Sequence, residues 1–264
     1  MSERRVLLIG YGAIGQAIMT HLQAASGYRL AVLRRNIGHD ALPKDVEALH
    51  DLEDVDEFAP DLIVEAAGQA VVRDRVAAWL RDGIDVLISS VGALHDADLR
   101  KQLEIAAQHG GSALLIPAGA LAGLDYVHAV GAVPGTHIRY ESRKPLAAWQ
   151  QEIERLGLQD EAATKPVTLY KGDAAGAAAR YPSNLNVAAT LALAAGGFDR
   201  VEVTVIADGR ATGNTHSIAV TGPVGKMDVR VVNSPAPDNP KTSIVVAHSV
   251  ARAIINHFSS IRMV

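Results

Sequence analysis

The chain has 264 residues, of which 48% are hydrophobic, enough to bury the core of one large domain or two modest ones. Its 25 basic and 29 acidic side chains nearly balance, and no run of like charge could follow a nucleic-acid backbone, so nucleic acid is not expected as a partner. The absence of cysteine excludes a disulfide framework, a thiolate nucleophile and a cysteine metal site.

The apolar runs of the sequence are all short. The run near the N-terminus, VLLI at 6–9, is shorter than the core of a secretory signal peptide. No run approaches the roughly 18 apolar residues that indicate a membrane-spanning helix. We therefore expect a cytoplasmic protein with no membrane partner.

The first half of the chain alternates short aliphatic runs with helical stretches. The aliphatic runs are typical of strands buried on both faces of a sheet, and the other stretches carry apolar residues at spacings of three and four. The alternation predicts an α/β fold with a Rossmann doubly wound parallel sheet. The predicted strands are 6–9, 30–33, 62–64, 86–89 and 113–116, the predicted helices are 13–25, 70–81 and 97–108, and residues 38–60 are interpreted as an irregular connection with a short helix.

The pattern changes after Pro117, where a glycine-rich segment at 118–125 begins a second, α+β domain. Its strands alternate with period two, which predicts a mainly antiparallel sheet. The segment SPAPDNP is typical of a turn, and we expect the helix after it to return to the Rossmann half. The predicted strands are 137–144, 201–208, 216–222 and 226–232, and the predicted helices are 185–197 and 242–258, the second capped by Thr242 or Ser243. The first predicted domain is formed by residues 1–119 and completed by 242–264, and the second is formed by residues 120–241.

The motif GYGAIG, with Gly10, Gly12 and Gly15, lies between the first predicted strand and the first predicted helix. Glycines at these positions allow a tight turn, close approach of a pyrophosphate and close packing of helix on strand. The N–H groups of the helix start, around Ala13 and Ile14, face the phosphates in such sites. We interpret the motif as a dinucleotide site; the alternative is a tight turn that binds no ligand.

Two further segments bear on the cofactor. An acidic residue normally binds the adenosine ribose of NAD at the end of the second strand, but Arg34 and Arg35 stand there. Arg34 is either a ligand of the 2′-phosphate of NADP or a solvated surface residue. After the third strand, Ala67 and Gly68 leave room for the ribose and nicotinamide, although such small residues also form plain tight turns.

Candidates for substrate chemistry lie in the second domain. His216 can exchange a proton near neutral pH, yet a hydrogen-bonded structural histidine is the better interpretation from its surroundings alone. Asn184 and Asn186 lie at the mouth of a helix, where an amide either caps the helix or binds a ligand. Lys241 precedes the last predicted helix, where it either binds an anion or is merely exposed. No HExxH, metal-ligand spacing or GxSxG occurs, so no metal is expected and a hydrolase is disfavoured.

Several motifs together resemble one family. GYGAIG, AGALAGLD at 118–125, YPSNLNVAAT at 181–190, the histidine strand and NPKTS at 239–243 are similar to segments of the L-aspartate dehydrogenases, and the similarity covers essentially the whole chain. It implies a homodimer formed through the second domain's sheet, NAD or NADP as cofactor, and reversible conversion of L-aspartate into oxaloacetate and ammonia, with iminoaspartate as a possible precursor for NAD biosynthesis. It also implies a catalytic role for His216 and cofactor contacts at Ala120 and Asn186. Arg34 departs from the acidic residue of some members, which puts strict NAD use in doubt.

Two other functions stay open on the sequence. A different two-domain reductase could act on another amino or hydroxy acid, because a fold does not fix a substrate. A dinucleotide sensor without enzymatic activity would need a basic or apolar partner surface, which the balanced charge does not favour.

Overall fold

The computed structural model describes residues 3–33, 42–181, 186–237 and 239–263. The chain divides into two compact units, Met1–Pro117 with Ala247–Met263, and Ala118–Val246. The division expected from the sequence placed the boundaries at residues 119 and 242. The C-terminal segment belongs largely to the first unit, so this unit is built from both ends of the chain.

The first unit is built on a six-stranded parallel sheet with the strand order β3-β2-β1-β4-β5-β6. This is the order of a dinucleotide-binding Rossmann sheet, and it confirms the predicted doubly wound fold. The order reverses direction between β1 and β4, which is where ligands of such sheets bind. The strands are β1 (Arg4–Ile9), β2 (Tyr28–Leu33), β3 (Val46–Leu49), β4 (Leu62–Glu65), β5 (Asp85–Ile88) and β6 (Leu114–Leu115).

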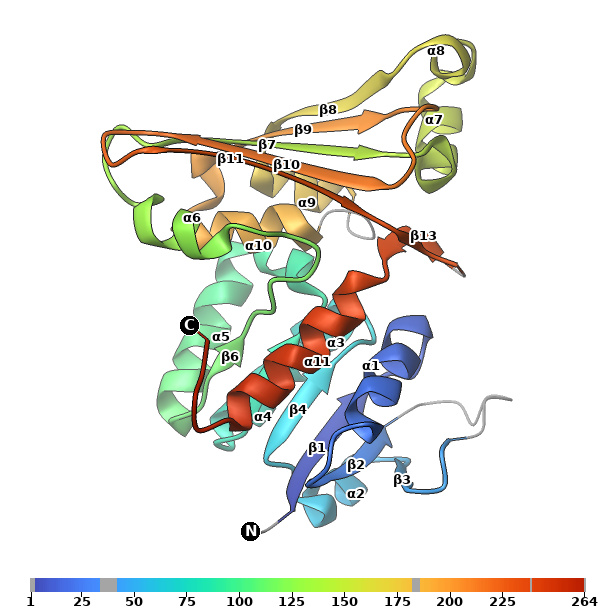
Figure 1. Cartoon of the computed structure of the whole chain (residues 1–264). Coiled ribbons are helices and arrows are strands. Elements are labelled where there is room, and N and C mark those ends of the chain that lie inside the picture. The colour runs from blue at the N-terminus through green and yellow to red at the C-terminus, as the bar shows by residue number, and fades with distance from the viewer. Residues whose placement is uncertain (1–2, 34–41, 182–185, 238, 264) are drawn as a thin grey trace. The chain divides into compact units, whose positions relative to one another are not determined.

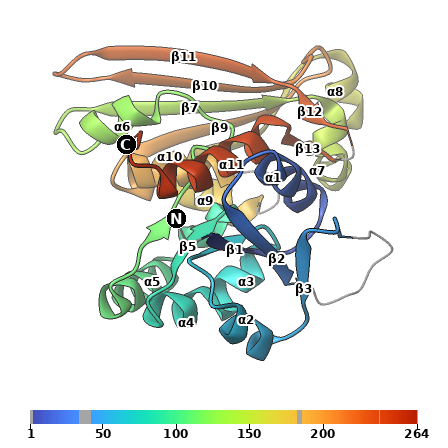
Figure 2. The same ribbon diagram turned by 60° about the horizontal axis from the view of Figure 1, so that its bottom comes forward.

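Helices cover both faces of this sheet because its central strands are apolar on both sides. Helix α1 (Ala13–Gln23) and helix α11 (Val245–Phe258) share a core with Val6 and Leu8 of β1 on one face. Fully burying an aliphatic side chain stabilises the fold by about 1.5–3 kcal/mol, so this cluster holds the C-terminal helix firmly. The other face is covered by α2 (Leu52–Phe58), α3 (Gln69–Asp74), α4 (Val76–Arg81) and α5 (Ala97–Gly110) (Figure 2).

The structure corrects three sequence-based expectations in the first unit. The segment 38–60, interpreted as irregular apart from one helix, contains the edge strand β3 as well as α2; β3 escapes a pattern search because only its end residues, Val46 and Leu49, are buried. The helix expected at 70–81 breaks at Arg75, whose φ of −129° lies outside the helical range. The strand expected at 113–116 pairs only over Leu114–Leu115.

The second unit is built on a five-stranded sheet with the order β11-β10-β7-β9-β8. Strands β7 and β9 are parallel and the other neighbours are antiparallel, as the predicted mainly antiparallel sheet requires. Helices α6 (Leu124–Val130), α9 (Ala174–Arg180) and α10 (Asn186–Ala194) lie against one face, here called the inner face (Figure 1). The strands are β7 (His137–Lys144), β8 (Val167–Asp173), β9 (Val201–Ala207), β10 (Asn214–Thr221) and β11 (Lys226–Asn233).

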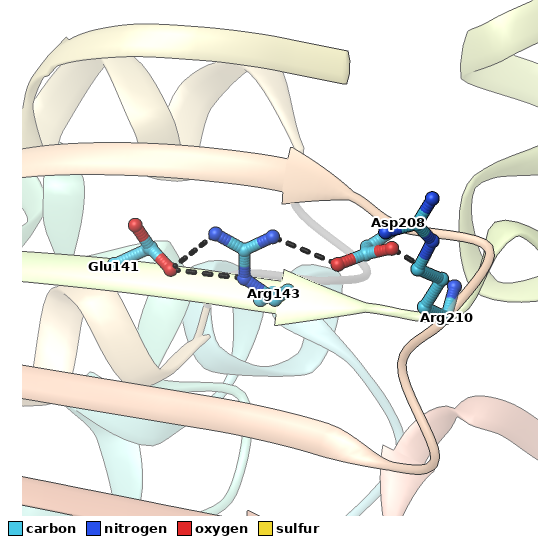
Figure 3. A network of polar contacts seen from close by, with 4 residues as sticks. All are labelled: Glu141, Arg143, Asp208 and Arg210. Carbon is cyan, nitrogen blue, oxygen red and sulfur yellow. Dashed lines mark hydrogen bonds and ion pairs between the residues drawn. The ribbon is translucent and has the colours of Figure 1, made fainter. Parts of the chain in front are cut away.

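The opposite, outer face of this sheet carries charged side chains. Arg143 on β7 contacts Glu141 at 3.1 Å and Asp208 at 2.8 Å, joining β7 to the end of β9 (Figure 3). The backbone N–H of Arg210 donates to Asp208, and this bond and the Arg143 guanidinium hold the pKa of Asp208 below its usual value. The network therefore fixes the turn that follows β9.

Several elements of the second unit were not predicted. Helices α7 (Gln150–Leu156) and α8 (Gln159–Thr164) bury one residue each, Ile153 and Ala162, too few to show a helical period. Strand β8 lies at the sheet edge. The segment 234–240, expected to be a turn, contains a turn at Pro237 within a hairpin, in which β12 (Pro235–Ala236) pairs with β13 (Asn239–Ser243). The expected helix start at 242 is wrong, because α11 begins at Val245. Thr242 and Ser243 are therefore strand residues and not helix caps.

Candidate functional site

The loop after β1 lies directly against the loop after β4, at the point where the strand order reverses. Gly10 has a φ of +94°, a conformation that side chains other than glycine rarely adopt. A Cβ atom at Gly10 would lie 2.8 Å from the Cα of Ala67. Both the backbone conformation and the close approach therefore require glycine at this position.

The start of helix α1 is shaped to receive an anion. A Cβ atom added at Gly12 would meet nothing within 4 Å, so the space beside this residue is open, whereas a Cβ at Gly15 would lie 2.5 Å from the Gly10 carbonyl oxygen. No side chain in the described part of the chain caps this helix, and its first turn holds no acidic residue. The N–H groups of Ala13 and Ile14 are left at a positive helix end. These residues fit the pyrophosphate of a dinucleotide.

Glu65, the last residue of β4, was not singled out from the sequence. Its side chain is fully buried, and one carboxylate oxygen accepts the backbone N–H groups of Ala67 at 2.8 Å and Gly68 at 2.6 Å. The carboxylate also accepts the N–H of Ser90 at 3.0 Å and its hydroxyl at 2.9 Å. One buried acid thus fixes the loops after β4 and β5, including two predicted cofactor contacts. The sequence did contain an indication of this role, because Glu65 is a charged residue at the end of a strand predicted to be buried.

His216 lies in the second unit, on the inner face of β10. It is 1% exposed and pairs directly opposite Ser142 of β7. Its Nδ1 is 2.8 Å from the hydroxyl of Tyr140, and the two rings are nearly parallel with centroids 6.1 Å apart. Nε2 is buried and has no hydrogen-bond partner among the described residues. An unpaired buried nitrogen is costly, so Nε2 is a candidate to pair with a ligand.

The protonation state of His216 follows from its surroundings. Burial, and then the positive charge of Lys144, lower the pKa of His216 to about 3, so the ring is neutral near pH 7. This value lies well below the ordinary pKa of histidine, about 6.5. Burial raises the pKa of Tyr140, which stays a protonated donor.

The hydrogen bond between Tyr140 and Nδ1 of His216 is compatible with two positions of the imidazole proton. When the phenol donates to Nδ1, the imidazole carries its proton on Nε2. When Nδ1 carries the proton, it donates to the phenol oxygen, and the Ser142 hydroxyl, which lies near the phenol, can accept the phenol's own hydrogen.

The other predicted site residues have varied surroundings. The backbone carbonyl of Ala120 accepts from Asn233 at 3.0 Å, and Asn186 is the first residue of α10. Lys241 was expected beside a helix start but lies within β13, and its Nζ is 3.3 Å from Gln151 at an exposed position. Arg34 and Asn184 lie outside the described residues.

The described residues contain neither a candidate metal site nor a candidate membrane-spanning helix. No group of three histidine, aspartate or glutamate side chains there could hold a metal ion. No described helix is long and apolar enough to span a membrane.

Comparisons with known proteins match the whole chain to one family. Residues 125–257 match the family model described as the C-terminal domain of aspartate dehydrogenase, and residues 10–117 match the NAD-binding domain of homoserine dehydrogenase. L-aspartate dehydrogenase 2 of Bordetella bronchiseptica is 45% identical over 97% of both chains, and L-aspartate dehydrogenase of Ruegeria pomeroyi is 36% identical over 98% of this chain and 94% of its own. The crystal structure of aspartate dehydrogenase from Thermotoga maritima has a TM-score of 0.77 at 23% identity, covers 99% of this chain and 100% of that one, and thus shares the fold.

The role of Glu65 can be tested by substitution. In Glu65→Gln an amide N–H meets the N–H of Ser90, so a buried donor loses its acceptor at a cost of about 1–3 kcal/mol. We expect a lower unfolding temperature and roughly tenfold weaker NADH binding, measured by thermal unfolding and by fluorescence titration. Glu104→Gln, on the exposed side of α5, is the matched control. An unchanged affinity for NADH in Glu65→Gln would show that the carboxylate does not position the cofactor loops.

Proposed function

The chain belongs to the L-aspartate dehydrogenase family and is an NAD(P)-dependent oxidoreductase, and we propose that His216 is the residue that manages the proton in its conversion of L-aspartate into oxaloacetate and ammonia. The observation that carries this proposal is the buried Nε2 of His216, which has no partner among the described residues. Iminoaspartate is the intermediate that links oxidation to loss of ammonia.

The first unit carries the groups that suit a dinucleotide cofactor. Gly10, Gly12 and the start of α1 suit the pyrophosphate, and the loop of Ala67 and Gly68 suits the ribose and nicotinamide. The family resemblance adds Ala120 and Asn186. A bound nicotinamide supplies the acceptor for the hydride that leaves the α-carbon of the substrate.

His216 can serve both directions of the reaction. With its proton on Nε2, the ring donates to the oxygen of the substrate carbonyl or carbinolamine during amination. During deamination the other tautomer acts, in which Nδ1–H donates to the Tyr140 oxygen and Nε2 is free to accept a proton. Nε2 then takes a proton from the water that attacks the imine carbon, and the imidazolium so formed returns it to the nitrogen that leaves as ammonia when the carbonyl forms. Tyr140 is thus a positioning residue that supports either tautomer.

We propose a homodimer formed through the outer face of the second unit's sheet. In the described part of this unit the helices α6, α9 and α10 cover the inner face only (Figure 1). The outer face has a hollow of about 380 Å³ whose lining includes Arg139, Glu141, Ser217 and Arg230. Charges of both signs on one face suit a self-complementary contact. The cytoplasmic location expected from the sequence also stays a prediction.

The substrate is tested by cofactor reduction with a panel of amino acids. We expect L-aspartate to support reduction of NAD or NADP, and D-aspartate, L-glutamate and L-alanine to give little or none. The two cofactors are assayed separately by absorbance of the reduced nicotinamide. Equal activity with L-alanine would contradict the assignment and favour a reductase of different specificity.

Replacing His216 tests the role of its proton. His216→Ala is expected to lower kcat by roughly 10²–10⁴-fold, the usual contribution of a positioned acid or base, and to leave NADH affinity nearly unchanged. His137→Ala, at an exposed position of the same sheet, is the matched control. Steady-state kinetics and NADH titration give the two readouts, and a near wild-type kcat in His216→Ala would remove this residue from the mechanism.

Cofactor choice is tested at Arg34. If its guanidinium binds the 2′-phosphate of NADP, the wild type accepts NADP alongside NAD, and Arg34→Asp shifts kcat/KM toward NAD. A charge-assisted hydrogen bond of this kind contributes about 1.5–3 kcal/mol, or roughly 10- to 150-fold in affinity. No detectable NADP binding to the wild type would mean that Arg34 is a surface residue.

A further inference from the structure

Lys144, the last residue of β7, is a buried cation that the proposed reaction does not yet use. Its side chain is 3% exposed, and its Nζ donates to the backbone carbonyl of Lys241 at 2.8 Å. The ammonium also lies 5.7 Å from the ring centroid of Trp149. These contacts hold the end of a normally flexible side chain at one place inside the second unit.

Lys144 and His216 lie close together on the inner face of the sheet. Ser142 is paired directly opposite His216, and Lys144 follows two residues later on the same strand, so its side chain lies on the same face. The positive charge of Lys144 also contributes, after burial, to the lowered pKa of His216. Lys144 and the buried Nε2 atom, which has no partner among the described residues, therefore belong to the same face of the sheet.

The charge of Lys144 favours an anion at this place. Burial, and then the charge of Lys241, lower the pKa of Lys144 to about 8, although the charge of Glu152 raises it, so the side chain remains largely cationic at pH 7. An ammonium has three N–H donors, of which one is directed to the Lys241 carbonyl. A substrate carboxylate is a strong acceptor for such a cation, because a hydrogen bond between two charged groups is about twice as strong as one between neutral groups.

We propose that the ammonium of Lys144 binds a carboxylate of the substrate while Nε2 of His216 faces the reacting centre, so that Lys144 sets the preference for an acidic substrate. This inference rests on the proposed function, because it assigns the substrate's own negative charge to a residue of that site. Lys241, the lysine suggested by the sequence, contributes its backbone carbonyl by holding Lys144 in place. Its own Nζ contacts Gln151 at an exposed position.

The test compares Lys144→Met and Lys144→Arg with Lys171→Met, which removes an exposed lysine of β8 as a matched control. Removing a charged hydrogen bond to the substrate is expected to raise the KM for L-aspartate on the order of 10- to 100-fold in Lys144→Met. Lys144→Arg keeps the charge and should recover part of this loss. Lys171→Met should behave as the wild type.

Two further readouts separate binding from folding and from turnover. Lys144→Met leaves the Lys241 carbonyl without its donor, so its unfolding temperature should fall, and KM and succinate affinity are therefore compared at a temperature at which all variants are folded. Calorimetric titration of succinate into the NADH-loaded protein should show binding in the wild type and binding at least tenfold weaker in Lys144→Met. If Lys144→Met does not fold, Lys144→Gln takes its place.

The outcomes distinguish this inference from the proposed function. A wild type that oxidises L-aspartate, with a KM and a succinate affinity that Lys144→Met changes less than twofold, would overturn the inference and leave the proposed function intact. A wild type without activity on L-aspartate, but with succinate binding that depends on Lys144, would overturn the proposed function and retain an anion site. Loss of neither property in Lys144→Gln would likewise contradict the role of this residue.

Discussion

The proposed chemistry of the second unit depends on one buried hydrogen bond, which joins the Tyr140 hydroxyl to Nδ1 of His216. Burial keeps the imidazole neutral, since it lowers the pKa of His216 to about 3. The phenol pairs with Nδ1 in either tautomer, and Nε2 is left buried without a partner in the described structure. The register of β7 and β10 makes this arrangement possible, because it brings residues 76 positions apart in the sequence into contact. Lys144 then adds a positive charge to the same face of the sheet.

The two units offer different chemical groups for binding: the first offers mainly backbone groups, and the second offers side chains. The first unit offers backbone N–H groups at the start of α1, and its glycines allow a ligand or a neighbouring loop to approach closely. The buried carboxylate of Glu65 in this unit accepts hydrogen bonds from Ala67 and Gly68 and thereby fixes the loop after β4. The second unit instead offers side chains whose charge is set by burial. Cofactor binding therefore depends on backbone geometry, and the proposed substrate chemistry depends on electrostatics.

The sequence predicted the parts of this structure that depend on local patterns. The glycine motif could be recognised because a strand, a turn and a helix follow one another directly in the sequence, from Arg4 to Gln23. The central strands could be recognised because they are apolar on both faces. Lys241 was placed wrongly because β13 forms through pairing with β12, which no local pattern reveals. The importance of Tyr140 and Lys144 was missed for a related reason: their surroundings come from sheet register. His216 itself was assigned through resemblance to a family, since its local sequence favoured a structural histidine.

The central claim is that burial keeps His216 neutral, and the most direct measurement is a pH titration of the ligand-free protein followed by nitrogen NMR of its histidine rings. Because the pKa of the folded state lies well below the ordinary value of about 6.5, the unfolded state binds more protons between these two values. The account predicts that the His216 resonances are those of a neutral ring at pH 7 and do not change as the pH falls to about 5. A ring that takes up a proton with a midpoint near the ordinary value would contradict it.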